Sequence, residues 1–275
     1  MFHVSTFWSY NRKMNGVGEM EKKPVYTDTY IQHLYIYLNE SDQFALFSGL
    51  TFAHFLDAMK LPKNLLLLKH PYEDASFNMH THMEFATQEE FGQLRKARAN
   101  KKSEFCWVDF RSEKQLNSLT SQEQAELLFI GHKKEPVRSP FFSTLQNEFV
   151  YLSSEEEETT KIYFRNVARL NELVGNYFTY LIRREENGQN FWRRKPKDMI
   201  PELPAEILQS LKKNYREGVL ISLADPEKTK NTIELHIRPV EEISFLDEFW
   251  SDIEEYTKQG ISRKIVYDRK QKAWK

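Results

Sequence analysis

The stretch "TYIQHLYIYLNESDQFALFSGLTFAHFLDAMKLP", residues 29–62, contains the unit that decides the fold. Two runs of aromatic and β-branched residues flank the polar segment from Asn39 to Asp42, which is typical of a hairpin turn. Apolar residues then recur at helical spacing as far as Pro62, namely Phe52, Phe55, Leu56 and Met59. The stretch therefore predicts two antiparallel strands followed by a helix.

The same order of strand, strand and helix recurs near residues 64–100, 148–185 and 219–258, without a repeat at the level of individual residues. Strands joined by short turns pair in antiparallel fashion, so we expect an α+β fold with mixed, largely antiparallel sheets. The segment "KKEPVRSP" (133–140) carries two prolines and favours a boundary near 133–145. We expect two closely packed lobes, 1–135 and 146–275, with one continuous domain as the alternative.

The composition is that of a globular protein with balanced charge. Of the 275 residues, 40% are apolar, and 39 Lys+Arg oppose 40 Asp+Glu for a net charge of −1. This balance gives no overall argument for nucleic acid or for an acidic membrane surface. No segment approaches 18 uninterrupted apolar residues, so we expect no membrane span.

The single cysteine, Cys106, excludes a disulfide within the chain and favours a reducing, cytoplasmic compartment. It lies in the apolar run "EFCWVDF" beside Trp107, which predicts a buried structural thiol. The chain also lacks the phosphate-binding G-x-x-x-x-G-K-[ST] loop, the G-x-S-x-G elbow and the H-E-x-x-H zinc motif. The leading hypothesis is therefore a soluble, intracellular, non-enzymatic binding or regulatory protein. Its partner would be an unknown protein or small molecule, and we expect an exposed apolar or aromatic patch.

The segment "SFNMHTHMEFA" (76–86) gives the first alternative. Its alternation predicts one strand over 77–85, with Phe77 and Met79 facing the core and Asn78 facing the polar side. His80, His82 and Glu84 would share that polar side, and H-x-H on a strand can supply two ligands to zinc or manganese. His236, on the polar side of another alternating strand, is the first candidate for a third ligand, followed by His132 and His70. This pattern predicts a metal-dependent hydrolase, and a divalent metal is the only cofactor that any of the patterns implies. The plainer interpretation is a polar sheet face.

The segment "LIRREENGQNFWRRKPKDMIP" (181–201) gives the second alternative. Between residues 183 and 197 it places an aromatic residue among cations, as a single-stranded nucleic acid would require for stacking and phosphate neutralisation. The residues are Arg183, Arg184, Trp192, Arg193, Arg194 and Lys195. The plainer interpretation is an exposed connection between helices, which the net charge of −1 favours.

Overall fold

A computed structural model gives the fold and describes residues 33–59, 62–70, 72, 74–94, 104–133, 136–153, 159–188, 201–223, 231–240 and 260–275. The strands in these ranges are β1 (His33–Asn39), β2 (Phe44–Ser48), β3 (Asn64–Lys69), β4 (Ser76–Asn78), β5 (Met83–Thr87), β6 (Phe105–Phe110), β7 (Phe149–Ser153), β8 (Thr160–Phe164), β9 (Val219–Leu223), β10 (Thr232–Pro239), β11 (Arg263–Asp268) and β12 (Ala273–Trp274). The helices are α1 (Phe52–Ala58), α2 (Phe91–Leu94), α3 (Glu113–Asn117), α4 (Ser121–Lys133), α5 (Ala168–Gly188), α6 (Ala205–Ser210) and α7 (Lys212–Glu217), and a short 3-10 helix spans Gln88–Glu90.

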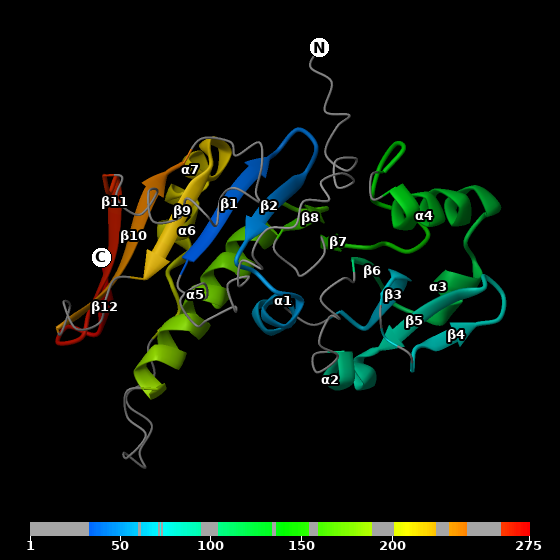
Figure 1. The fold of residues 1–275 in the computed structure, drawn as a ribbon, viewed down its shortest axis with the longest axis horizontal. Coiled ribbons are helices and arrows are strands. Elements are labelled where there is room, and N and C mark those ends of the chain that lie inside the picture. The colour runs from blue at the N-terminus through cyan, green and yellow to red at the C-terminus, as the bar shows by residue number, and fades with distance from the viewer. Residues whose placement is uncertain are drawn as a thin grey trace, which may run out of the picture.

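The described strands form one antiparallel sheet of 12 strands, in the order β12-β11-β10-β9-β1-β2-β8-β7-β6-β3-β5-β4. The strands of the two ends are steeply inclined to each other, as expected of a twisted sheet (Figure 1). This architecture confirms the predicted α+β class with antiparallel pairing. The helix expected in the last unit, over 241–260, lies outside the described residues except for Gly260.

The described part of the first unit, residues 33–59, folds as its sequence predicts. β1 and β2 form a hairpin in which Tyr37 lies opposite Leu46. In the turn, the backbone N–H of Asp42 donates to Asn39 Oδ1 over 3.0 Å. Thr51 caps α1 by accepting a hydrogen bond from the backbone N–H of His54. Local sequence therefore determines this unit.

Strands from the two sides of the predicted boundary at 133–145 alternate within the sheet. β2 pairs with β8, β1 pairs with β9, and β6 pairs with β7. The pairing shows no division at 133–145, and the assignment of two lobes stays a prediction.

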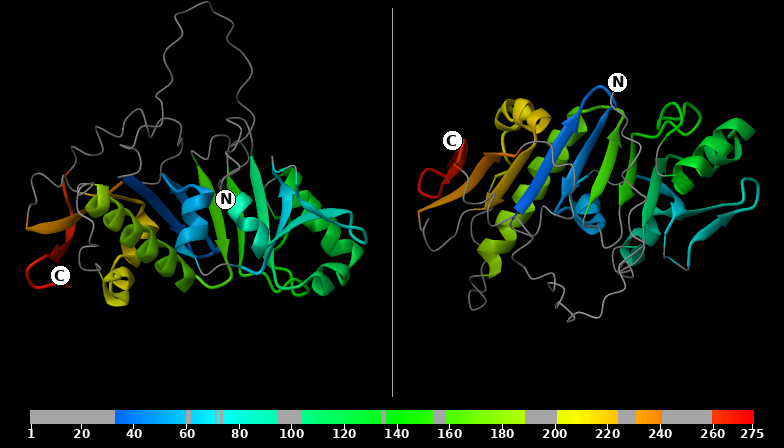
Figure 2. Two further views of the ribbon diagram at one scale, coloured as in Figure 1. Left: turned by 90° about the horizontal axis from the view of Figure 1, so that it is seen from below. Right: turned by 45° about the horizontal axis from the view of Figure 1, so that its top comes forward.

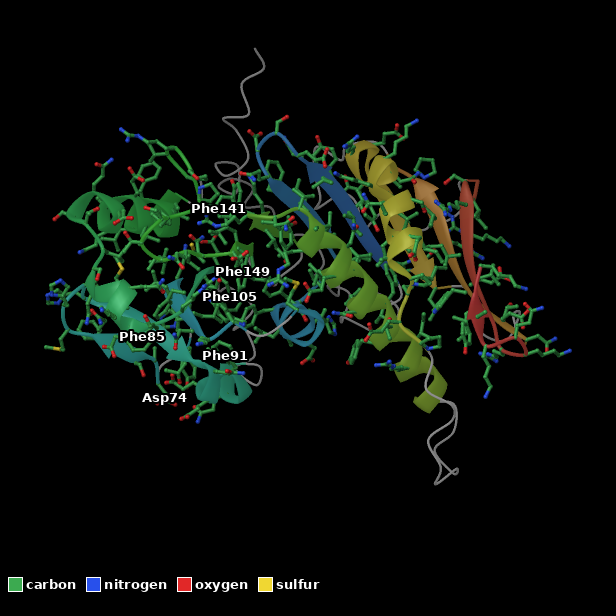
Figure 3. All side chains as sticks on the ribbon, turned by 180° about the vertical axis from the view of Figure 1, so that it is seen from behind. Asp74, Phe85, Phe91, Phe105, Phe141 and Phe149 are labelled. Carbon is green, nitrogen blue, oxygen red and sulfur yellow. The ribbon has the colours of Figure 1, made fainter. Side chains whose placement is uncertain are left out.

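The two faces of the sheet are covered differently. On one face, apolar residues of most strands form a long core with α1, α2, α5, α6 and α7, and Figure 2 shows α5 running along this side of the sheet. On the other face, β3, β5, β6, β7 and β8 form a short core with α3, α4 and the loop that follows α4. Phe105 and Phe149 belong to the long core, whereas Phe85 belongs to the short core (Figure 3).

Cys106 lies in the short core on β6 and is fully buried. Burial raises the pKa of its thiol far above the usual range. The predicted structural thiol is confirmed.

Candidate functional site

The histidine pair lies in a turn rather than on a strand, so the prediction of one strand over 77–85 is wrong. β4 ends at Asn78, whose side-chain Oδ1 accepts hydrogen bonds from the backbone N–H groups of His80 and Thr81 over 3.1 and 2.8 Å. This asparagine turn folds the chain back, and His82 takes a left-handed φ of 56° before β5 begins. His80 and His82 are both exposed at the tip of this hairpin.

The turn also changes which side chains face inward at the start of this segment, whereas Thr81, Met83 and Phe85 are buried as the alternation predicts. Asn78, expected on the polar side, is buried and donates to Asn117 Oδ1 of α3 over 2.7 Å. Phe77 and Met79, expected in the core, have 49% and 78% of their surface exposed. Hydrophobic alternation failed here because the hydrogen-bonding of one asparagine outweighed it.

The structure pairs two of the candidate metal ligands, His70 and Glu84, but does not assemble the candidates into one site. His236 lies on β10, and seven strands separate β10 from β5 in the sheet. Glu84 on β5 lies 2.7 Å from Nε2 of His70, and His132 is exposed near the end of α4. Among the described residues, no group of three or more His, Cys, Asp and Glu side chains could hold a metal ion. The metal site stays a prediction that lacks a third ligand in this part of the chain.

The basic-aromatic segment is described only at its start. Arg183 is half-buried in α5, and Arg184 follows it in the same helix. Trp192, Arg193, Arg194 and Lys195 lie outside the described residues. Nucleic-acid binding therefore stays a prediction.

Helix α4 presents apolar side chains on two opposite sides. On its inner side, Leu127 and Ile130 are buried in the short core. On its outer side, four exposed residues recur at helical spacing, and we name this set the α4 face: Ala125, Leu128, Phe129 and His132. Leu128 and Phe129 have 57% and 42% of their surface exposed, and Val137 just beyond the helix has 59%. The signal in the sequence was the run "LLFI", because a helix of 13 residues cannot turn four consecutive side chains to one side.

A capping box fixes the start of α4. The backbone N–H of Thr120 donates to Glu123 Oε2 over 3.0 Å, and the backbone N–H of Glu123 donates to Thr120 Oγ1 over 3.2 Å. Thr144, in the loop after α4, also donates to Glu123 Oε2 over 3.0 Å. Burial opposes ionisation of Glu123, but the hydrogen bonds from Thr120 and Thr144 prevail and hold its pKa below the usual value. The helix start and the following loop are thus tied to one carboxylate.

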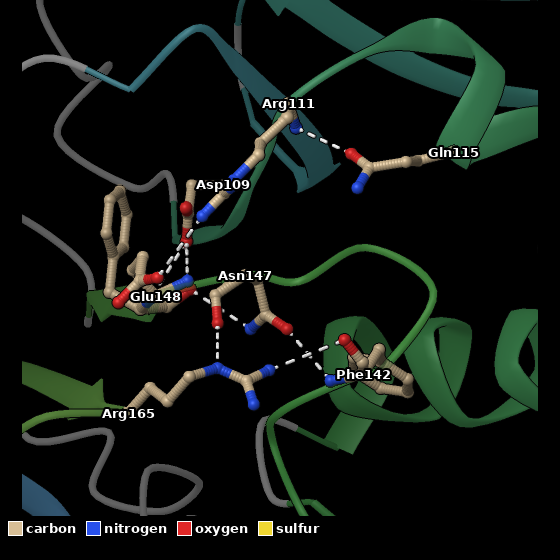
Figure 4. Close-up of polar contacts among 8 residues, drawn as sticks. Asp109, Arg111, Gln115, Phe142, Asn147, Glu148 and Arg165 are labelled. Carbon is tan, nitrogen blue, oxygen red and sulfur yellow. Dashed lines mark hydrogen bonds and ion pairs between the residues drawn. The ribbon is translucent and has the colours of Figure 1, made fainter.

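The loop after α4 is held by buried polar groups around Asn147, which is fully buried (Figure 4). Its Oδ1 accepts from the backbone N–H of Phe142 over 2.8 Å, and its Nδ2 donates to the carbonyl of Pro140 over 2.9 Å. Arg165 at the end of β8 donates through Nε to the Asn147 carbonyl over 2.7 Å. These contacts give hydrogen-bond partners to the polar groups that this loop buries, and they fix the path of the loop on the sheet.

Asp109 on β6 completes this support. Its Oδ1 accepts from the backbone N–H groups of Glu148 and Phe149 over 2.8 and 2.7 Å (Figure 4). Burial raises the pKa of this carboxyl to about 6, against the opposing effect of the two backbone donors. We call Asp109, Asn147 and Arg165 the loop anchor. The capping box of α4 and the loop anchor together hold the helix and the following loop in place beneath the α4 face. An exposed apolar surface that is held in this way is suited to binding.

No helix in the described parts of the chain combines the length and the apolar character needed to cross a membrane. Comparisons with protein-family models, with curated proteins and with solved structures gave no match for this chain.

Proposed function

We propose that this protein is a non-enzymatic binding or regulatory protein that docks a protein partner on the α4 face. The observation that carries the proposal is the exposure of Leu128 and Phe129, at 57% and 42%, on a helix whose inner side is already buried. An amphipathic helix needs apolar residues on one side only, so apolar residues on the second side indicate a surface that is covered by something else.

The support beneath the helix favours the same proposal. A docking surface that is already ordered loses little conformational freedom when the partner binds. The Thr120–Glu123 cap and the loop anchor fix α4 and the following loop on the sheet before any partner arrives. The expected partner is a segment with an apolar stripe, such as an amphipathic helix, because Leu128, Phe129 and Val137 offer no charge to pair. The buried, unpaired Cys106 suits a reducing cytoplasm, where we place this interaction.

The exposed surface of Leu128 and Phe129 determines how much these two side chains contribute to partner binding when the partner covers them. Complete burial of one such side chain stabilises by about 1.5–3 kcal/mol. Since about half of each side chain is exposed, covering both contributes roughly 2 kcal/mol to binding. Replacing both with serine should therefore weaken partner binding roughly 30-fold.

Site-specific photo-crosslinking in the cells that make the protein tests the proposal. A photoreactive phenylalanine analogue replaces Phe129 in one strain and Tyr180 in another. Tyr180 on α5 is the matched control because it is aromatic and 37% exposed. We expect a discrete adduct from position 129 that Leu128→Glu abolishes, and no such adduct from position 180. Absence of an adduct at 129, the same adduct at both positions, or an adduct unaffected by Leu128→Glu would contradict the proposal.

A further inference from the structure

The α4 face has the same residue spacing in both directions along the helix. Leu128 and Phe129 lie on either side of its midpoint, and Ala125 lies as far before this midpoint as His132 lies after it. All four residues are exposed. Because reversal of the helix leaves this spacing unchanged, a second copy of α4 in antiparallel orientation presents a matching set of positions.

The sizes of the side chains fit this antiparallel arrangement. With a two-fold axis at the midpoint, Leu128 and Phe129 each meet their counterpart in the second copy, and the small Ala125 lies opposite the larger His132 of the second copy. Leu128 and Phe129 have 57% and 42% of their surface exposed. The largest apolar side chains of the face therefore lie at the centre of the contact, where an interface excludes water most completely.

The charges along α4 also favour an antiparallel second copy. Glu126 lies before the midpoint of the α4 face, and Lys133, seven residues later, ends the helix. Residues seven apart lie on the same side of a helix, so antiparallel copies bring the acidic position of each helix alongside the basic position of the other. Parallel copies would instead bring like charges together. The net charge of −1 adds little repulsion between two copies.

Helix α4 lies toward the end of the molecule opposite β12, where a second copy can approach it (Figures 1 and 2). Its 13 residues make it about 20 Å long, and a helix with its side chains is about 10 Å wide. A contact of this size is smaller than the roughly 800 Å² per partner of a standard interface. The dimer should therefore dissociate on dilution.

We infer that the partner of the α4 face is a second copy of this chain, bound through antiparallel pairing of the two α4 helices in a two-fold symmetric dimer. This inference rests on the proposed docking function and names the partner at the same surface. Leu128 and Phe129 form the centre of the contact, and Ala125 and His132 flank it on both sides.

Sedimentation equilibrium of the purified full chain measures the association. We expect the average mass to rise from that of one chain toward that of two as the protein concentration increases. In a symmetric dimer each substitution is present in both copies, so the roughly 30-fold effect of the double serine variant applies twice. Leu128→Ser with Phe129→Ser should therefore weaken self-association roughly a thousandfold. Tyr180→Ser, on α5, is the matched control and should associate like the unaltered protein.

Single cysteines on α4 test the antiparallel orientation. Ala125→Cys and His132→Cys are prepared separately and oxidised either alone or as a mixture, and the native Cys106 does not interfere because it is fully buried. We expect a disulfide-linked dimer from the mixture only. In the antiparallel dimer the two copies of position 125 are separated by about 10 Å along the helix axis, beyond the roughly 7 Å between Cα atoms that a disulfide can bridge.

The possible results separate this inference from the docking proposal. A monomer at every concentration, or efficient crosslinking of Ala125→Cys with itself, would overturn the inference. Equal self-association of the double serine variant and the Tyr180→Ser control would also overturn it. If the photo-crosslinked adduct from position 129 then contains a different protein, the docking proposal stands without the dimer, whereas absence of any adduct contradicts both.

Discussion

Replacement of Gly131 by alanine tests how closely α4 approaches the sheet. A Cβ added at Gly131 would lie 2.8 Å from Leu68 Cβ and 3.3 Å from the Leu68 carbonyl oxygen. Carbon atoms in contact are ordinarily about 3.5–4.0 Å apart, so helix and strand must separate by roughly 1 Å. Neither Cβ atom can rotate away, because each is bonded directly to its own backbone.

The expected free-energy change is the difference between two opposing effects. Overpacking in a core costs about 1–3 kcal/mol, and the rigid contact at Gly131 places this substitution toward the upper end. In the opposite direction, alanine stabilises the helix by up to about 1 kcal/mol relative to glycine, because it has the higher helix propensity. We therefore expect Gly131→Ala to lower the free energy of unfolding by about 1–2 kcal/mol, with a fall of several degrees in Tm.

Two other glycines provide controls for Gly131→Ala. Urea unfolding measures the free energy of unfolding of all three alanine variants. A Cβ at Gly92 would meet nothing within 4 Å, so Gly92→Ala should stabilise by about 0.5–1 kcal/mol. A Cβ at Gly175 would lie 2.7 Å from a methyl carbon of Leu208, which can rotate away, so Gly175→Ala should fall between the other two. If Gly131→Ala proves as stable as Gly92→Ala, the inferred close packing of α4 on β3 is incorrect.

Three further predictions concern single side chains. The folded-state pKa of Asp109 is about 6, above its ordinary 3.8, so its contribution to stability is present at low pH and is lost as the pH rises from 4 to 6. The stability of Asp109→Asn relative to the unaltered protein should therefore increase between pH 4 and pH 7, by up to about 3 kcal/mol. Urea unfolding at several pH values measures this difference, and a difference that does not change with pH would contradict the prediction. His33, whose pKa falls from 6.5 to about 4, should act in the opposite sense, so that stability is lost as the pH falls below 6.5 and His33→Gln removes this part of the slope. NMR titration of His33 checks the value directly, and a midpoint near 6.5 would refute it. Leu127→Ala should cost about 2–5 kcal/mol, whereas Leu128→Ala should change stability by less than about 0.5 kcal/mol, and similar losses for the two would contradict the assigned orientation of α4.

Local signals in the sequence predicted the elements well where each signal acts over a few residues. The two strands and the helix of residues 29–62 follow from turn composition, helical spacing and Pro62, and the structure confirms all three. The T-x-x-E pattern of Thr120 and Glu123 is also a local signal, and it forms the capping box at the start of α4. The segment at 76–86 was misjudged because alternation and turn chemistry competed, and Asn78 decided the outcome through its hydrogen bonds.

The α4 face was missed for a different reason. The run "LLFI" was visible, but an apolar run by itself does not show how much of a helix the core can cover. That depends on the width of the contact between α4 and β3, where Gly131 lies against Leu68 and leaves Leu128 and Phe129 on the far side. The orientation of α4, with Gly131 against Leu68, therefore determines which apolar residues remain available to a partner.

The alignment of His33, Ser222 and His236 across β1, β9 and β10 depends on strand register, which no pattern along the chain reveals. His236 was correctly expected on the polar side of its strand, but the residues opposite it, Ser222 of β9 and Lys264 of β11, are set by the pairing of the strands. A slip of β9 by one residue would place an apolar side chain beside His236 where Ser222 now lies. The register is held from the other face, because Ile221 and Ile237 are both fully buried in the long core and lie opposite each other. The apolar core thus fixes the register, and this register places Ser222 between His33 and His236 only when the opposite face of the sheet is packed.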